Sequence, residues 1–429
     1  MPARGLQSPA ACGRLTAAPS AIMVRTEGAT VELTIEDIAG RAGVDVAYAR
    51  RLVDLGALGP EGHGYREKDA HVAALLHMWE DAGLTAESIL AAAESGELSL
   101  DFLESPGWEL PPRLDRTYGE LAEERSMPVD LLQAIQRAMG FAPPDPDDLA
   151  RPDDVVIADL VRVVLDIGGS EDAIRRLFRV YADNLRRLAL AEADLYVEQI
   201  ERPSRSAGTS EPELMRRGAG VGRDMAPLVK ATLAAIYERH RQHVWAQHSV
   251  ETAEAVLEGA GLYQRAERTP TVCFVDLTGY TRLTEEQGDE AAARLASRLG
   301  TLVDAVALRH GGRPVRWLGD GGMFLFPEAT AAVRAALEMS EGAPAAGLPT
   351  THIGIHSGPV VFQDGDVYGR TVNLASRIAD LAEAGDVLTT EETRRRVEDI
   401  KIDWARIGPA ELQGVGSPVT LYRASWRGQ

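Results

Sequence analysis

The spacing of apolar residues changes near residue 270 of this 429-residue chain. Between about residues 33 and 265, apolar positions recur every three or four residues, which is typical of amphipathic helices. After that point, short β-branched runs such as TVCFVDL (271–277) alternate with helical patterns. We therefore expect an all-α N-terminal half followed by an α+β domain. The length of the chain also favours two or three domains over one.

The middle of the chain, residues 106–265, has the most sustained helical pattern. The segments 155–169 and 173–200 keep a 3.6-residue apolar period and end in turn residues. A further helix is expected from about Asp224 to His248, whereas ERPSRSAGTSEPE (201–213) reads as an exposed loop. The sequence of this region suggests no catalytic constellation, so we interpret it as a helical regulatory or dimerisation region.

Residues 31–105 begin with two short amphipathic helices that are separated at Gly43, the spacing of a helix-turn-helix. Thr34 and Asp37 have the spacing of a capping pair for the first helix. The segment resembles the N-terminal winged helix of the MerR regulator family, in which the element Gly64-Tyr65-Arg66 follows the second helix. The resemblance covers about 40 residues and leaves two interpretations open, DNA binding or a helical scaffold.

Charge and composition argue against nucleic acid and membrane as partners of this chain. The formal net charge is −20, and 44 acidic against 29 basic residues lie in the first 269. Nucleic-acid-binding surfaces are normally basic, so nucleic acid is not an expected partner. No run of about 18 apolar residues is present, so no membrane-spanning segment is expected. Residues 1–30 read as a disordered tail without the apolar core of a signal peptide, and the two cysteines fit a reducing cytoplasm.

The last region, residues 266–429, predicts a sheet with helices on one face. We expect a strand at 271–277, a helix at about 284–310 and a hairpin at 314–326, with later strand and helix patterns. Asp276 then lies at a strand end and Asp320 in the hairpin turn, where two carboxylates could converge on hard cations. Two divalent ions held by carboxylates and phosphate oxygens commonly assist phosphoryl transfer. Either Asp alone is weak evidence, because Asp is common in turns.

Three motifs in this region resemble the signatures of the class III adenylyl and guanylyl cyclases, in the same order. They are FVDLTGYTRL (274–283), RWLGDGGMFLF (316–326) and GDVYGRTVNLASRI (365–378). The resemblance implies a ferredoxin-like catalytic domain that makes cyclic AMP from ATP. It also implies that Asp276 and Asp320 bind two Mg²⁺ or Mn²⁺ ions.

The same resemblance assigns roles to residues of the third motif. Asn373 and Arg377 lie one helical turn apart, and in the family these positions orient the ribose and neutralise charge on the α-phosphate. Asp366 matches the position that reads the purine, where a carboxylate would accept from the adenine amino group. Its alternative reading is a turn residue in DGDVYG.

Arg316 departs from the family pattern, because adenylyl cyclases normally have Lys at this position to help recognise adenine. Arg can also donate a hydrogen bond but is larger and planar. The chain has 42 Arg and only three Lys, so a drift from Lys to Arg is in keeping with its composition. A guanylyl cyclase would carry an acceptor such as Glu here, so ATP is the favoured substrate.

In this family the site forms across a head-to-tail dimer, so the resemblance implies a homodimer with two equivalent sites. The helical half would control how the protomers meet. Two other readings stay open. One is a weakly active or inactive cyclase-like nucleotide sensor, suggested by Arg316. The other is a DNA-binding regulator with a cyclase-like effector domain.

Overall fold

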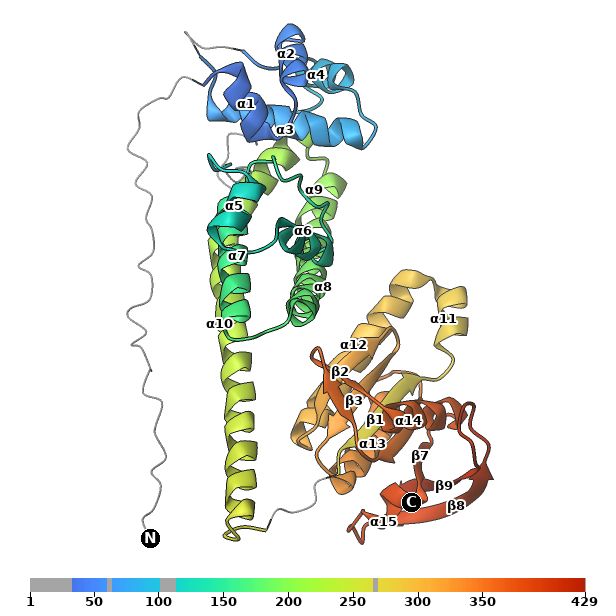
Figure 1. Cartoon of the computed structure of the whole chain (residues 1–429). Helices are drawn as coiled ribbons and strands as arrows, with labels where there is room; N and C mark the ends of the chain where they lie inside the picture. Colours follow the sequence, from blue (N-terminus) through green and yellow to red (C-terminus); the bar gives the residue numbers. More distant parts are fainter. Residues whose placement is uncertain (1–32, 60–63, 101–112, 265–268, 429) are drawn as a thin grey trace, which may run out of the picture. The chain divides into compact units, whose positions relative to one another are not determined.

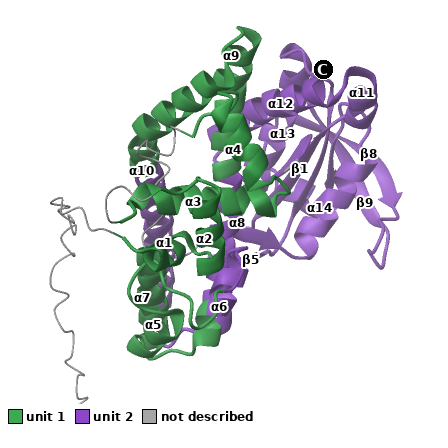
Figure 2. Ribbon diagram, turned by 90° about the horizontal axis from the view of Figure 1, so that it is seen from above, with its two compact units in different colours: residues 1–132, 144–166, 189–232 green, residues 133–143, 167–188, 233–429 purple. Residues whose placement is uncertain are grey.

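The computed structural model describes residues 33–59, 64–100, 113–264 and 269–428 (Figure 1). The predicted tail at 1–30 therefore lies outside the described residues, whereas the Gly64-Tyr65-Arg66 element lies within them. The chain divides into two compact units, one of residues 1–132, 144–166 and 189–232 and one of residues 133–143, 167–188 and 233–429 (Figure 2). Within the described residues, no helix combines the length and apolar character needed to cross a membrane. The division into 31–105, 106–265 and 266–429 stays a prediction.

The described part of the N-terminal half is helical, apart from isolated bridges. Its helices are α1 Ile35–Ala42, α2 Val46–Asp54, α3 Glu67–Asp81, α4 Ala86–Glu94, α5 Tyr118–Glu124, α6 Val129–Ala138, α7 Pro152–Asp166, α8 Glu171–Tyr196, a π-helix η2 Val197–Glu201, α9 Arg202–Ser206 and α10 Glu211–Gly259.

The first helix pair follows the prediction. Thr34 and Asp37 form the expected capping box at the start of α1, and the left-handed Gly43 (φ 71°) ends that helix. Tyr65 bridges back to Leu33 in an antiparallel pair, which closes the segment. Ile38, Leu52 and Leu76 form its buried core together with neighbouring apolar side chains.

The predicted loop at 201–213 is wrong for most of its length. The helical path continues through Ser206, and α10 begins at Glu211. Pro203, which suggested a loop, occupies the first turn of α9, where the missing N–H of proline is not needed. Gly208 (φ 82°) provides the short break. The predicted helix at Asp224–His248 is part of the longer α10.

The C-terminal domain is built on a seven-stranded sheet of order β2-β3-β1-β4-β7-β9-β8, with a separate β5–β6 hairpin. Only the β4–β7 pair is parallel. The strands are β1 Thr271–Leu277, β2 Arg313–Leu318, β3 Gly321–Phe326, β4 Thr351–Ser357, β5 Val361–Gln363, β6 Asp366–Tyr368, β7 Val387–Thr390, β8 Ile402–Ala410 and β9 Val419–Trp426. The helices are α11 Tyr280–Gln287, α12 Asp289–Arg309, α13 Ala329–Ala345, α14 Arg370–Leu381 and α15 Glu391–Arg395.

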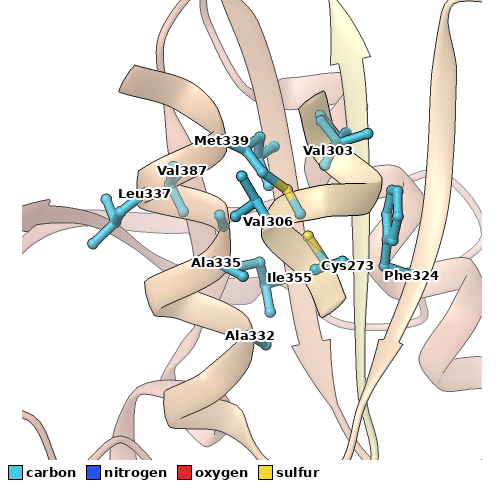
Figure 3. Close-up of a cluster of buried hydrophobic side chains, with 14 of the residues drawn as sticks. Cys273, Val303, Val306, Phe324, Ala332, Ala335, Leu337, Met339, Ile355 and Val387 are labelled. Carbon is cyan, nitrogen blue, oxygen red and sulfur yellow. The ribbon is translucent and has the colours of Figure 1, made fainter. Parts of the chain in front are cut away.

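Helices cover both faces of this sheet, so the expectation of one covered face is wrong. Cys273 of β1 packs with Val303 of α12 and Met339 of α13 on one face (Figure 3). Val272 of the same strand packs with Ala375 of α14 on the other. Because apolar residues of β1 point to both faces, each face needs a cover. The predicted helix at 284–310 is also divided, since Gly288 (φ 84°) separates α11 from α12.

Candidate functional site

The two predicted metal ligands lie at the same end of the central strands. Asp276, near the end of β1, pairs in register with Gly321 of β3, the residue that follows Asp320. The N–H of Leu277 donates to the backbone oxygen of Asp320 (3.3 Å), which ties the strand end to the hairpin turn. The Asp276 side chain stays 43% exposed. The hairpin therefore brings the two carboxylates to one edge of the sheet, as the sequence predicted.

Gly321 makes this close approach possible. A Cβ atom at Gly321 would lie 2.7 Å from Oδ1 of Asp276 and 2.7 Å from the backbone oxygen of Val275. These distances are far inside van der Waals contact, so a larger residue would displace the Asp276 carboxylate. The glycine of the GDGG turn is thus a steric requirement of the carboxylate pair.

The electrostatics of the pair fit a cation. Burial raises the pKa of Asp320, and the negative charge of Asp276 raises it further. Nε2 of His352, on the neighbouring strand β4, lies 3.6 Å from Oδ2 of Asp276. A divalent ion between the carboxylates would relieve their repulsion.

The donor set is small. Among the described residues, no group of three or more His, Cys, Asp or Glu side chains is arranged to hold a metal ion. Two carboxylates suit an ion such as Mg²⁺, which keeps several waters and is usually completed by the phosphate oxygens of a substrate. The residues therefore fit metal binding together with a phosphorylated ligand.

The two predicted purine-reading residues form a second pair. The Arg316 guanidinium on β2 donates to Oδ2 of Asp366 on β6 in an ion pair. The second oxygen of Asp366 accepts from the N–H of Val367 (2.7 Å). The side chains are 43% and 23% exposed, respectively, so both remain accessible to a ligand.

Asn373 and Arg377 form the third pair, on the exposed side of α14. The opposite side of this helix is buried against the sheet through Thr371, Leu374, Ala375, Ile378 and Ala379. A Cβ atom at Gly354 of β4 would collide with the backbone of Ala375 and Ala379, so α14 lies directly on that strand. Arg377 makes an ion pair with Asp380 (3.2 Å) within its own helix. Both residues are therefore available to a ligand or a partner.

All three pairs belong to the same side of the sheet. Side chains alternate along a strand, so Asp276 shares a face with Val272 and Phe274, which pack with Ala375 of α14. Arg316 pairs in register with Met323 of the same cluster. The described residues show no hydrogen bond or ion pair that joins one pair to another. The chain thus places three separate pairs of candidate site residues on the side of the sheet that α14 covers.

His352 is the residue of this site that sequence reasoning missed. It pairs in register with Asp276 from strand β4 and is partly buried. The sequence held a partial signal for it. His352 and His356 are four residues apart in the strand THIGIHS, so their side chains lie on the same face of that strand. Without the register between β1 and β4, nothing connected them with Asp276.

Comparisons with known proteins identify the type of domain that carries these residues. Residues 262–423 match the adenylate and guanylate cyclase catalytic domain. The chain carries a class III adenylate/guanylate cyclase catalytic domain. Residues 115–244 match the adenylate cyclase regulatory domain, and the two domains together make the protein an adenylate cyclase enzyme. Neither match reaches residues 33–105, so the resemblance of that segment to MerR regulators stays a prediction.

Two curated relatives are named adenylate cyclases, and one solved structure is reported with them. The cyclase is 28% identical over 316 residues to the pH-sensitive adenylate cyclase MT1302 of Mycobacterium tuberculosis, covering 71% of this chain and 76% of that protein. It is 29% identical to an adenylate cyclase of Streptomyces coelicolor, covering 63% of this chain and 68% of the relative. The solved adenylyl cyclase CyaB from P. aeruginosa is 28% identical, covers 37% of this chain and 94% of that chain, and has a TM-score of 0.34.

Proposed function

We propose that the protein converts ATP to 3′,5′-cyclic AMP and pyrophosphate with two divalent metal ions, at sites completed between two copies of the chain. Its helical half regulates the reaction. The Arg316–Asp366 pair is the observation that carries the choice of ATP. A carboxylate accepts from the 6-amino group of adenine, and a guanidinium donates to N1. Guanine presents a carbonyl oxygen and an N–H at the same positions, so both contacts would become unfavourable.

The carboxylates of Asp276 and Asp320 would hold the ions, and this role is supported by their shared strand end and mutual repulsion. Bound divalent ions lower the pKa of a ribose 3′-hydroxyl and neutralise the triphosphate. The 3′-oxygen forms a bond to the α-phosphorus, and the bond from that phosphorus to the bridging oxygen breaks. Pyrophosphate leaves and the hydroxyl proton passes to solvent. Arg377 would neutralise the charge that develops on the α-phosphate, and Asn373 would orient the ribose.

Completion by a second copy is supported by the exposed side of α14. Asn373 and Arg377 point away from their own helix–sheet contact, and no hydrogen bond or ion pair of the described residues ties them to Asp276 or Asp320. The resemblance to the class III cyclases, in which the site forms across a head-to-tail dimer, implies such a second copy. A two-fold axis would give two equivalent sites, each with the metal carboxylates of one protomer and the α14 residues of the other.

The test is cyclic nucleotide production by the purified full-length chain with ATP or GTP and Mn²⁺, beside Asp276→Ala. We expect cyclic AMP from ATP, far less product from GTP, and none above background from the variant. Equal product from the variant would overturn the metal role of Asp276. More product from GTP than from ATP would overturn the assigned substrate.

A nucleotide sensor with little turnover is the second candidate, and Arg316 in the usual Lys position is the observation that favours it. If Arg316→Lys gains large activity over a nearly inactive wild type, this second reading is correct.

DNA binding by the N-terminal helix pair gains no support from its charges. Arg41, Arg50 and Arg51 are the arginines of α1 and α2, and each makes an ion pair with a carboxylate of the same segment. Those carboxylates offset the positive charge that phosphate contacts require. A helical scaffold is therefore the proposed role of residues 33–100. A gel shift whose affinity falls steeply with salt would contradict it.

A further inference from the structure

The β5–β6 hairpin presents two neighbouring side chains to Arg316. Val367, the middle residue of β6, is buried in the cluster of Val272, Met323 and Ala375 and anchors the hairpin to the sheet. Because side chains alternate along a strand, its neighbours Asp366 and Tyr368 point to the other side of β6. Both meet the same guanidinium. Asp366 forms the ion pair, and the Tyr368 ring centroid lies 5.9 Å from Cζ of Arg316.

An arginine at this position needs both restraints. Its side chain has four rotatable bonds and is 43% exposed, so an ion pair alone leaves the guanidinium plane free to turn about the shared oxygen. A ring within about 6 Å attracts the cation and limits that rotation. Lysine carries a compact charge that needs no fixed plane, whereas arginine must present one N–H edge toward a purine.

We propose that Tyr368 is a positioning residue for purine selection, because its ring and Asp366 together orient Arg316 to favour adenine. This inference rests on the proposed adenylate cyclase function. Tyr368 need not touch the nucleotide; it acts through Arg316. Loss of the ring should weaken ATP binding more than GTP binding, because only adenine gains from a correctly oriented donor.

The hairpin supplies a matched control. Arg313, on the same strand as Arg316, has its Cζ 5.7 Å from the ring centroid of Phe362 on β5. Phe362 and Tyr368 are exposed to similar extents, 59% and 46%. Phe362→Leu therefore removes an equivalent arginine–aromatic contact from the same hairpin without touching Arg316. Any general loosening of the hairpin should appear in both variants.

The experiment compares the full-length wild type with Tyr368→Leu, Tyr368→Phe and Phe362→Leu. The readouts are KM and kcat for ATP and GTP, with calorimetric Kd values for both nucleotides. We expect Tyr368→Leu to raise the KM and Kd for ATP by about two- to fivefold, the size of a partly exposed cation–π contact, with kcat nearly unchanged. The ATP-to-GTP preference should fall by the same factor. Tyr368→Phe keeps the ring and should retain the preference, as should Phe362→Leu.

The outcomes separate this inference from the proposed function. If the wild type makes cyclic AMP but Tyr368→Leu shifts the preference no more than Phe362→Leu does, the positioning role is wrong and the function stands. Equal losses in Tyr368→Phe and Tyr368→Leu would also overturn the role of the ring. If the wild type makes no product, the function fails, and the Kd ratios alone decide the inference. A wild type that binds neither nucleotide overturns both.

Discussion

In strand β3 of the cyclase domain all six residues are buried, whereas the 49-residue helix α10 of the helical half buries only Leu214 and Ala219. Phe324 and Phe326 of β3 lie in a core closed by α12 and α13 (Figure 3), and Met323 and Leu325 pack on the α14 face. In the helical half, large apolar residues remain on the surface of the chain, including Ile167 at 80%, Leu228 at 68% and Trp245 at 59% exposure. The cyclase domain closes its core with its own residues, whereas α10 leaves several large apolar residues exposed.

This difference indicates where each region obtains its stability. A domain with a closed core can hold catalytic side chains in place by itself. Helices with uncovered apolar residues gain stability when another surface buries them. In the proposed dimer that surface is the helical half of the second copy. The cyclase domain would then supply the chemistry, and the helical half would set how tightly two protomers associate.

The largest expected effect is a loss of kcat when either the metal-binding half-site or the α14 half-site of the cyclase domain is mutated. Asp276→Ala and Arg377→Ala should each lose at least about a hundredfold in kcat, since each removes charge stabilisation from the transition state. A mixture of the two variants should regain activity, because a mixed dimer holds one site with both residues intact. At equal amounts the expected recovery is about a quarter of wild type. A mixture no more active than its components would contradict sites shared between copies.

A stability experiment tests the comparison of the cores directly. Phe324→Ala empties a fully buried position of β3 and should lower the free energy of unfolding by about 3–5 kcal/mol. Trp245→Ser removes a larger but exposed side chain of α10 and should change the free energy of unfolding of the monomer by less than about 0.5 kcal/mol. Its effect should appear in the dimer dissociation constant, measured by analytical ultracentrifugation. A large loss of monomer stability in Trp245→Ser would show that α10 is packed by its own chain.

Gly354→Ala tests whether close packing inside the cyclase domain holds its catalytic side chains in place. The added methyl group would collide with the backbone of α14 at Ala379, and such overpacking typically costs about 1–3 kcal/mol. Because α14 carries Asn373 and Arg377, the helix shift should also lower kcat, while KM changes less. Gly416→Ala is the control, since a Cβ atom there meets nothing within 4 Å. Equal kcat values for the two variants would mean that α14 tolerates the displacement.

Much of the cyclase domain could be predicted because its motifs fix local geometry. The turn at Gly319 and Asp320 follows from glycines between two apolar runs, and Asp276 follows from the end of a β-branched run. Contacts that depend on which strands are neighbours, and in what register, could not be predicted from the sequence. His352 meets Asp276 only because β4 lies beside β1, and the sequence does not state strand order.

The helical half was predictable in type but not in its bounds. Its apolar period identifies helices, yet Pro203 suggested a loop in a segment that is mostly helical. Proline is tolerated in a first turn and disruptive in the middle of a helix, and the sequence alone did not show which position it occupied. The capping pair of Thr34 and Asp37 was recognised because its signal lies within four residues.

That capping pair gives a smaller expected effect. Thr34→Ala removes the side-chain acceptor for the N–H of Asp37 (3.1 Å) and should destabilise the α1–α2 segment by about 1 kcal/mol. Thr34→Ser keeps the hydroxyl and should restore most of the loss. Hydrogen exchange of the α1 amides is the measurement. Unchanged protection in Thr34→Ala would mean that packing of Ile38 alone holds the helix.

The smallest expected effect is a pH dependence that arises from His356, a buried histidine of strand β4 in the cyclase domain. Burial lowers the pKa of His356, with Arg370 and Arg396 acting in the same direction and Glu392 opposing them. Its Nδ1 lies 2.9 Å from the Thr390 hydroxyl. A neutral folded histidine contributes stability that is full above its ordinary pKa of about 6.5. This contribution is lost as the pH falls through that value toward the lowered one.

The free energy of unfolding should therefore decrease between pH 7.5 and 5.5, by less than the loss in Phe324→Ala. His356→Asn, which does not titrate, should flatten this decrease. His243→Asn replaces an exposed histidine of α10 and should keep the wild-type slope. If His243→Asn flattened the slope and His356→Asn did not, the pH dependence would arise in the helical half. His356 would then contribute nothing to it.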